Sequence, residues 1–257
     1  MSKAKSVVIG EFVAIEIDGA VAKVTFDRGD LLNALSAQAM EELRDAAQSL
    51  AAETQCHSVV LTGGSAISAG ADLKDPRLTD RSKLSLLEQR EAVKLGPDMC
   101  QAWADLEQIT ICAIERFCVG GGLALAVSCD HRVMATDAHA RLPEVPLGMN
   151  MSWRSVPRIV ALIGPAKSKE LVILGRRVEA DEALAWGLVD RVAEPGTTLD
   201  HAMKMAQSYA SLPPVAVRMA KQAIDTSASP LGFATSFMDR DQFLLSRLAN
   251  DEPAPKA

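Results

Sequence analysis

The stretch Gly120-Gly-Gly-Leu-Ala-Leu-Ala-Val-Ser-Cys129 places three glycines directly before a run of small and apolar residues. Glycine turns where other residues cannot, and the apolar run after it is typical of a buried helix. Short apolar stretches stand on both sides, Ile109-Thr-Ile-Cys-Ala-Ile114 before it and Arg132-Val-Met-Ala135 after it. Both are typical of strands that are covered on two faces. The middle of the chain therefore predicts strands alternating with helices, which is an α/β fold.

A β-hairpin is predicted near the start of the chain. Two stretches of alternating residues between Phe12 and Phe26 are joined by Asp18-Gly19, a dipeptide typical of type I′ turns. Val59-Val-Leu-Thr-Gly63 predicts a buried strand that ends at glycine. Between them Ser36 is a predicted N-cap, because apolar residues recur behind it at helical spacing. These residues are Met40, Leu43, Ala47 and Leu50.

The remaining segments are predicted from their polar residues, prolines and glycines. The stretch from Asp75 to Gln89 is polar with weak periodicity, and we interpret it as a mobile loop or a loose helix. Beyond about residue 165 the pattern is mainly helical. Pro165 suits a first helical position, Gly175 a helix C-cap, and Pro213-Pro214 a break between helices. Residues 250–257 are expected to be frayed.

Composition limits the class of protein. The 257 residues match one large α/β domain, or a core domain with a helical tail. A net charge of −6 with interspersed acids and bases argues against a nucleic-acid partner. No apolar stretch reaches the roughly 18 residues that span a bilayer, and the first residues lack the apolar core of a signal peptide. We therefore expect a soluble protein without a membrane partner.

Cysteine and histidine usage predicts neither disulfides nor a metal ion. The cysteines are odd in number, stand among apolar residues and lack ligand-like spacing, which favours reduced core thiols and a cytoplasmic location. The histidines also lack ligand spacing, and no G-x-S-x-G motif is present. The residues concerned are Cys56, Cys100, Cys112, Cys118, Cys129, His57, His131, His139 and His201.

Three segments are candidates for chemistry. In Ile67-Ser-Ala-Gly-Ala-Asp72, small side chains would let a ligand reach backbone N–H groups, although an ordinary loop fits as well. In Val119-Gly-Gly-Gly-Leu-Ala124, the amides that open a helix suit a phosphate or an oxyanion, and a tight turn is the alternative. In Arg141-Leu-Pro-Glu144-Val-Pro-Leu-Gly148, an apolar loop would raise the pKa of Glu144 toward that of a general base, although a lone Glu is more often solvated.

In their joint order these segments resemble the crotonase superfamily, that is, the enoyl-CoA hydratase/isomerase family. The resemblance covers most of the first 195 residues. It is carried by Leu32-Asn-Ala-Leu35, Ser68-Ala-Gly-Ala-Asp72, Gly120-Gly-Gly122, Ser128-Cys-Asp130, Pro143-Glu144, Gly164-Pro-Ala-Lys and Glu182-Ala-Leu-Ala-Trp-Gly-Leu-Val189.

The resemblance implies a fold, an assembly and a substrate. The fold would be a crotonase-like spiral of β-β-α units in residues 1–195, with a helical oligomerisation region in residues 196–257. The assembly would be a homotrimer or a hexamer made as a dimer of trimers. The substrate would be an acyl-CoA thioester, with coenzyme A as part of the substrate and no separate cofactor.

Site residues follow from the same resemblance. The N–H groups of Ala71 and Gly121 would form an oxyanion hole around the thioester oxygen, and Glu144 would match the second of the two glutamates of family hydratases. No contact is assigned to the C-terminal tail, which lacks a clear match. Residues expected to line the CoA and substrate site are Leu31, Leu32, Ala69, Asp72, Leu73 and Ala124.

The sequence departs from the family pattern at Ala124, where hydratases have their first glutamate. A methyl group cannot bind a water or transfer a proton, so hydration by two carboxylates is in doubt. We expect isomerisation of an enoyl-CoA double bond with Glu144 as single base. The alternatives are a hydratase or another enolate reaction, or an acyl-CoA-binding protein without catalysis. Glu115-Arg116 and Met149-Asn-Met-Ser-Trp153 also depart from the pattern, and their effect on the acyl pocket is left open, with Trp153 a packing or pocket residue.

Overall fold

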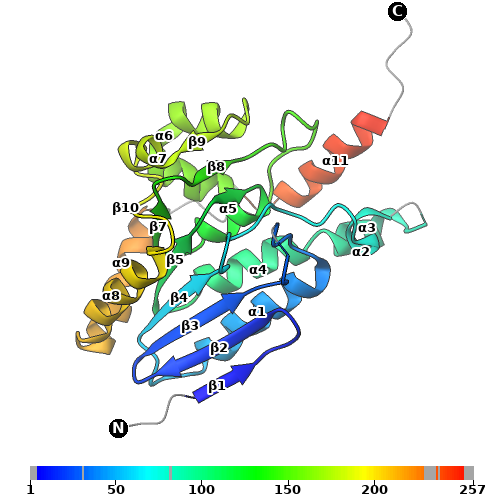
Figure 1. Cartoon of the computed structure of the whole chain (residues 1–257). Helices are drawn as coiled ribbons and strands as arrows, with labels where there is room; N and C mark the ends of the chain where they lie inside the picture. Colours follow the sequence, from blue (N-terminus) through cyan, green and yellow to red (C-terminus); the bar gives the residue numbers. More distant parts are fainter. Residues whose placement is uncertain (1–4, 31, 81–82, 229–235, 237, 252–257) are drawn as a thin grey trace, which may run out of the picture.

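The computed structural model describes residues 5–30, 32–80, 83–228, 236 and 238–251, and these form an α/β fold with two sheets (Figure 1). The larger sheet contains, in spatial order, β1 (Lys5–Val8), β2 (Val13–Asp18), β3 (Val21–Phe26), β4 (Ser58–Thr62), β5 (Ile109–Ile114), β7 (His131–Ala135) and β10 (Arg191–Ala193). The smaller contains β6 (Phe117–Val119), β8 (His139–Arg141) and β9 (Val178–Glu179).

The larger sheet is antiparallel from β1 to β3 and parallel from β3 to β10. Its parallel strands alternate with helices along the chain, as the sequence predicts. The helices are α1 (Ala37–Ala51), α2 (Pro76–Thr79), α3 (Leu86–Ala92), α4 (Leu95–Ala104), α5 (Gly121–Ala126), α6 (Ser155–Val172), α7 (Ala180–Trp186), α8 (Thr198–Ala210), α9 (Pro214–Ala228) and α11 (Asp239–Asp251).

The predicted hairpin is confirmed, but its turn lies one residue later than expected. Asp18 pairs with Val21, so Gly19 and Ala20 form the loop. A type I′ turn needs positive φ at both loop residues, whereas Gly19 has φ 58° and Ala20 is not among the residues with positive φ. The prediction of a type I′ turn at Asp18-Gly19 was therefore wrong, because Asp18 extends the ladder instead of bending it.

The central strands are covered on both faces, as their continuous apolar sequence predicts. On β4, Val59 and Leu61 pack in one core with α1 and α4, while Val60 packs in a second core with α8. Neighbouring side chains point to opposite faces of a strand, which separates the two cores. Helix α1 begins at the predicted N-cap, since the Ser36 hydroxyl accepts a hydrogen bond from the Ala39 N–H at 3.1 Å. Its four predicted apolar residues are buried.

The segment from Asp75 to Gln89, read as a loop or loose helix, contains α2 and the start of α3, with residues 81–82 outside the description. Pro165 starts a new helical segment inside α6, because Gly164 before it has φ 72° and ψ 167°. Helix α6 is capped at Ile173, so the expected cap at Gly175 lies two residues too late.

Helices α8 and α9 are separated at Pro213-Pro214 as predicted. Helix α11 extends to Asp251, and residues 252–257 lie outside the description. The assignment of residues 196–257 to oligomerisation stays a prediction.

All five cysteines are free and buried. Within the described residues, no helix has both the length and the apolar sequence to cross a bilayer.

Candidate active site

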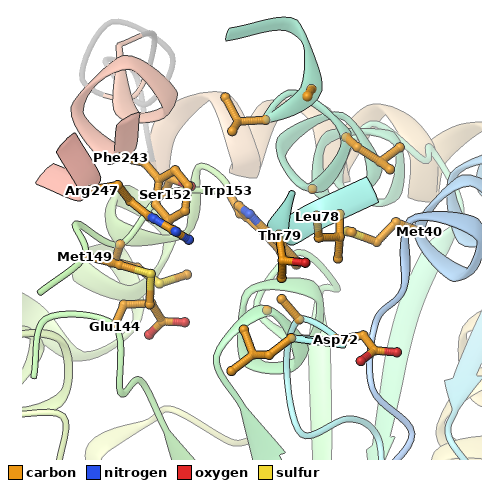
Figure 2. A pocket seen from close by; sticks show the side chains of 18 residues that line it. Met40, Asp72, Leu78, Thr79, Glu144, Met149, Ser152, Trp153, Phe243 and Arg247 are labelled. Atoms are coloured by element: carbon orange, nitrogen blue, oxygen red, sulfur yellow. The ribbon is translucent and has the colours of Figure 1, made fainter. Parts of the chain in front are cut away.

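A cavity opens where the predicted segments meet, between the loop after β4, the start of α5 and the loop after β8 (Figure 2). Helices α2, α3, α4 and α11 complete its wall. The cavity is therefore built from segments that are far apart in the sequence. Its lining residues are Met40, Ala71, Asp72, Leu73, Leu78, Thr79, Ala92, Val93, Leu95, Gly96, Gly121, Glu144, Met149, Met151, Ser152, Trp153, Phe243 and Arg247.

Each glycine of the triplet faces a different neighbour that leaves no room for a side chain. A Cβ atom at Gly120 would lie 2.8 Å from Glu144 Oε1, and one at Gly121 would lie 2.2 Å from Trp153 Cζ3. At Gly122 it would lie 2.8 Å from the Cβ of Ser68. At a separation under 3.0 Å, either the new Cβ atom or its neighbour would have to shift. The triplet thus lets a carboxylate, an indole ring and a neighbouring loop all approach the start of α5.

The backbone N–H groups of Ala71 and Gly121 are not used in the hydrogen bonds of the fold. Leu35 N donates to Gly70 O at 2.8 Å and Asp72 N donates to Leu35 O at 2.9 Å, so this pairing skips the N–H of Ala71. Gly121 is the first residue of α5, and the first N–H groups of a helix have no acceptor within it. Among the described residues neither N–H has a protein acceptor.

The two segments that carry these N–H groups touch through Gly70, whose φ is 96°. A Cβ atom at Gly70 would lie 3.1 Å from Val119 O and 3.6 Å from Gly121 N. Val119 N also donates to Ser68 O at 3.0 Å, which fixes the register of the two loops. The amides of Ala71 and Gly121 therefore face one region of the cavity, an arrangement that can stabilise an oxyanion.

Glu144 is held beside these amides in an apolar setting. Met149 N and Leu147 N donate to its carbonyl oxygen at 2.8 and 3.1 Å, so the loop closes on itself. Burial raises the pKa of Glu144 to about 7, and only its own backbone N–H acts in the opposite direction. Its Oε2 atom is buried without a hydrogen-bond partner among the described residues. Such a carboxylate can accept and return a proton near neutral pH.

Trp153 closes the cavity from the other side. A Cβ atom at Gly96 of α4 would lie 2.1 Å from Trp153 Cε2, so the indole lies between Gly96 and Gly121. Trp153 and Arg154 both have left-handed backbone angles, with φ 63° and 54°. Arg154 N donates to Asp239 Oδ2 at 2.6 Å, which ties this turn to α11. Trp153 is therefore both a packing residue and a pocket residue.

The family model described as Enoyl-CoA hydratase/isomerase matches residues 16–252. The chain belongs to this family, the crotonase superfamily. It is 34% identical over 215 residues to the short-chain-enoyl-CoA hydratase of Clostridium acetobutylicum, covering 83% of this chain and 80% of that protein. It is 31% identical over 215 residues to the crotonyl-CoA hydratase of Syntrophomonas wolfei, covering 83% and 81%.

The fold agrees with solved enoyl-CoA hydratases. A crystal structure of the Bacillus anthracis enoyl-CoA hydratase matches with a TM-score of 0.78 at 30% identity, covering 94% of this chain and 92% of that one. The crotonase fold implied by the sequence is therefore confirmed. Enzymes of this family bind acyl-CoA thioesters and are typically oligomeric.

Most family positions named from the sequence lie at the cavity. Ala71, Gly121 and Glu144 line it together, and Asp72 and Leu73 line it at the loop after β4. The Asp72 carboxylate is 2.7 Å from Arg28 Nη1. Burial acts to raise the pKa of Asp72, but Arg28 and the Lys74 N–H outweigh it, so the pKa is lowered.

Leu32 and Ala69 lie outside the cavity lining. Leu32 is exposed, and its carbonyl accepts from Ala69 N at 2.9 Å. Ala69 is half-buried, and the assignment of both residues to CoA binding stays a prediction. Leu31, which was also assigned to CoA binding, lies outside the described residues.

Ala124 is fully buried in the core and is not among the residues that line the cavity, so its assignment to the substrate site stays a prediction. Its N–H donates to Gly120 O at 3.0 Å and its carbonyl accepts from Ser128 Oγ at 2.8 Å. The methyl group of Ala124 packs in the core and brings no polar atom to the cavity.

Glu115 and Arg116, whose effect on the pocket the sequence left open, lie outside the cavity lining. Glu115 Oε1 accepts from the hydroxyl of Thr198 at 2.6 Å and so holds the start of α8. Arg116 keeps the left-handed backbone that a glycine would adopt, with φ 51°. The segment Met149-Asn-Met-Ser-Trp153, by contrast, does shape the cavity.

Sequence reasoning missed α11 and Asn33. Phe243 and Arg247 of α11 line the cavity, although no contact was assigned to the tail. Asn33 has φ 48°, and its amide nitrogen donates to Phe26 O at 2.9 Å and Ala66 O at 3.2 Å. It anchors the loop that carries Leu32. The Leu-Asn-Ala-Leu motif was a signal for Asn33, whereas nothing local marks α11 as part of the site.

Proposed function

We propose that this protein converts 3-enoyl-CoA thioesters into 2-enoyl-CoA thioesters, with Glu144 as the single acid and base. The observation that carries this proposal is the buried Glu144 Oε2, which has no partner among the described residues while its pKa is raised to about 7. Asp72 is the other carboxylate of the cavity lining, and Arg28 holds it at 2.7 Å. Ala124 supplies no second proton-transfer group.

The reaction balances with one carboxylate. Glu144 takes a proton from C2 of the substrate, and the electron pair of the C–H bond delocalises onto the thioester oxygen. The N–H groups of Ala71 and Gly121 donate to that oxygen while it is negative. Protonated Glu144 then donates its proton to C4, which leaves the double bond between C2 and C3. No cofactor beyond the CoA of the substrate is needed.

A pKa near 7 suits both halves of this cycle. A carboxylate with its ordinary pKa would be a weaker base, and one with a much higher pKa would stay protonated at neutral pH. The oxyanion hole should matter as much as the base, because loss of one preorganised donor costs about 2.7–4 kcal/mol in other enzymes. Substrate binding would also exclude water from Glu144.

Hydration of a 2-enoyl-CoA is the second candidate. It is favoured by the names of the relatives, which include a short-chain-enoyl-CoA hydratase and a crotonyl-CoA hydratase. Hydration needs one group to deprotonate a water and a proton for C2. In this chain Glu144 alone would have to serve both steps, since Ala124 replaces the other glutamate of family hydratases.

The test compares the two reactions on one protein. A 3-enoyl-CoA and a 2-enoyl-CoA of the same chain length are assayed with the wild type, Glu144→Gln and the control Glu179→Gln, an exposed carboxylate outside the cavity lining. We expect isomerisation in the wild type and the control, and a loss of about a hundredfold or more in Glu144→Gln. Faster hydration than isomerisation by the wild type would refute the single-base proposal.

We also propose that the chain forms a homotrimer or a dimer of trimers. Helix α9 supports an assembly, because it exposes large apolar side chains to solvent in the single chain. Light scattering coupled to size exclusion measures the mass directly. A monomer at micromolar concentration would contradict this part of the proposal. The apolar residues concerned are Val215, Met219 and Ile224.

A further inference from the structure

The cavity contains a cation that the proposed reaction does not use. Arg247 of α11 lines the same cavity as Glu144. Among the described residues no carboxylate and no other acceptor is paired with its guanidinium. Other arginines near the cavity are paired, Arg28 with Asp72 and Arg90 with Asp241. The side chain of Arg247 is half-buried, so a ligand that removes the guanidinium from water must supply an anion to offset the cost.

Glu144 does not neutralise Arg247. Burial raises the pKa of Glu144, and only its own N–H acts to lower it, so no cation stabilises its charged form. No ion pair joins the two side chains within the described part of the chain. The base and the cation therefore occupy one cavity as separate groups, each available to a different part of a ligand.

Arg247 lies on the side of the cavity that carries Glu144. Figure 2 shows Arg247 on the same side as Glu144 and Met149, across from Asp72 and Met40. Asp72 belongs to the loop expected to hold CoA, so Arg247 faces that loop across the cavity. The wall beside Arg247 is apolar and suits a hydrocarbon chain, with Met149, Met151, Trp153 and Phe243.

The helix that carries Arg247 is fixed to the rest of the wall. Arg90 Nε of α3 lies 2.6 Å from Asp241 Oδ1. Asn150 N donates to Ser246 Oγ at 2.9 Å, and Asn150 Nδ2 donates to Gln242 Oε1 at 3.1 Å. These contacts connect α11 to two other walls of the cavity. The backbone that carries Arg247 is therefore held in place without a ligand.

We propose that Arg247 selects acyl-CoA thioesters whose acyl chain ends in a carboxylate, that is, CoA monothioesters of dicarboxylic acids. The guanidinium presents parallel N–H donors that match a carboxylate with two hydrogen bonds. A chain that ends in a methyl group would bury the guanidinium without a partner. This inference rests on the proposed function, which places the reacting carbons of the thioester at Glu144 and so directs the acyl chain toward Arg247. It adds the class of acyl chain that the site prefers.

Binding of saturated thioesters tests this without any turnover. Isothermal titration would compare monocarboxylic acyl-CoA thioesters with dicarboxylic ones of equal length, over chains of four to eight carbons. At one chain length or more, we expect the dicarboxylic thioester to bind the wild type about tenfold to a hundredfold more tightly, as for a hydrogen-bonded charge pair. Equal affinities at every length would overturn the proposal.

Variants of Arg247 separate the acyl carboxylate from the CoA phosphates. Arg247→Met should remove the preference, because it weakens binding of the dicarboxylic thioester and tightens binding of the monocarboxylic one, and it should leave binding of free CoA within about twofold of the wild type. Arg247→Lys should retain a smaller preference, because an ammonium group lacks the paired donors. If Arg247→Met weakened all three ligands equally, the guanidinium would bind CoA phosphate and the proposal would fail.

The matched control is Arg77→Met. Arg77 stands on α2 next to the lining residues Leu78 and Thr79, and its guanidinium is already paired with Glu41. Removing it changes the net charge as Arg247→Met does, and the preference should persist. Loss of the preference in this control would overturn the assignment to Arg247. Because no catalysis is measured, the result is independent of whether Glu144 acts in isomerisation or hydration.

Discussion

Gly96 lies against the indole of Trp153, so closely that a Cβ atom at position 96 would be 2.1 Å from Cε2. The contact joins α4 to the loop that follows Glu144. Alanine is a better helix residue than glycine by up to about 1 kcal/mol, so Gly96→Ala should stabilise an isolated α4. In this protein the indole blocks the methyl group.

We predict that Gly96→Ala lowers the free energy of unfolding by about 1–3 kcal/mol, which is typical of an overpacked core. In a Trp153→Ala background the same change should have no cost or a small gain, because the obstructing ring is gone. Urea unfolding of the four proteins in this double-mutant cycle measures the coupling. Equal effects in both backgrounds would show that the ring does not require the glycine.

A second prediction concerns Gly120, whose backbone has φ 54° and ψ −122° and whose Cα faces the Glu144 carboxylate. Gly120→Ala adds backbone strain of about 1–3 kcal/mol and also displaces the carboxylate. We expect kcat to fall by about a hundredfold, the order seen when a catalytic group moves by 1 Å.

Gly196→Ala is the control for strain alone. Gly196 has φ 81°, and nothing lies within 4 Å of a Cβ atom there. This variant should lose stability while kcat stays unchanged. If Gly120→Ala lost stability but kept full kcat, the contact between Gly120 and Glu144 would have no catalytic meaning.

The pH dependence of the reaction should report Glu144. Its pKa is raised to about 7 by burial, and the proposed base acts when deprotonated. We expect log kcat/KM for a 3-enoyl-CoA to rise with unit slope up to about pH 7 and then to level. A profile that levels below pH 5 would mean that another group limits the reaction.

The same group predicts how stability changes with pH. A carboxyl whose pKa is higher in the folded state stabilises the fold below its ordinary pKa of 4.5, and this contribution is lost as pH rises through about 7. The free energy of unfolding of wild type minus that of Glu144→Gln should fall by about 3 kcal/mol between pH 4 and pH 8. Urea unfolding at both pH values measures it, and a constant difference would contradict the raised pKa.

The stability of the fold should depend more on the charge of the side chain at position 33 than on its size. Asn33→Gly keeps the backbone at φ 48° and loses the hydrogen bonds to Phe26 and Ala66, so we expect a loss of about 1–3 kcal/mol. Asn33→Asp places a carboxylate against these carbonyl oxygens and should cost more. Thermal unfolding gives the order, and a higher KM for the thioester should accompany it. A more stable Asp variant would refute the assigned donor role.

Local patterns in the sequence were sufficient for the elements of the sheet. Val59 to Thr62 and Ile109 to Ile114 are mainly apolar because both faces of these strands are covered, and Ser36 marks the start of α1 by its hydroxyl. The hairpin turn was misplaced by one residue, since Asp18-Gly19 fits a common turn type while the strand pairing prefers Gly19-Ala20.

The site was predictable where its chemistry depends on backbone or on one loop. Ala71, Gly121 and Glu144 line one cavity because glycines at 70 and 120 allow the segments to touch. The burial of Ala124 and the arrival of α11 were not predictable, because each depends on how distant elements pack. No local property of Arg247 distinguishes it from the other arginines of a solvated helix.

The wall that α11 contributes has a consequence for synthesis. Ala71, Gly121 and Glu144 leave the ribosome well before Phe243 and Arg247 do, and chains generally begin to fold from the N-terminal side. We therefore expect Ala71, Gly121 and Glu144 to come together on the nascent chain before α11 is synthesised. The proposed catalytic groups would then be in place before the helix that carries the proposed selectivity residue Arg247.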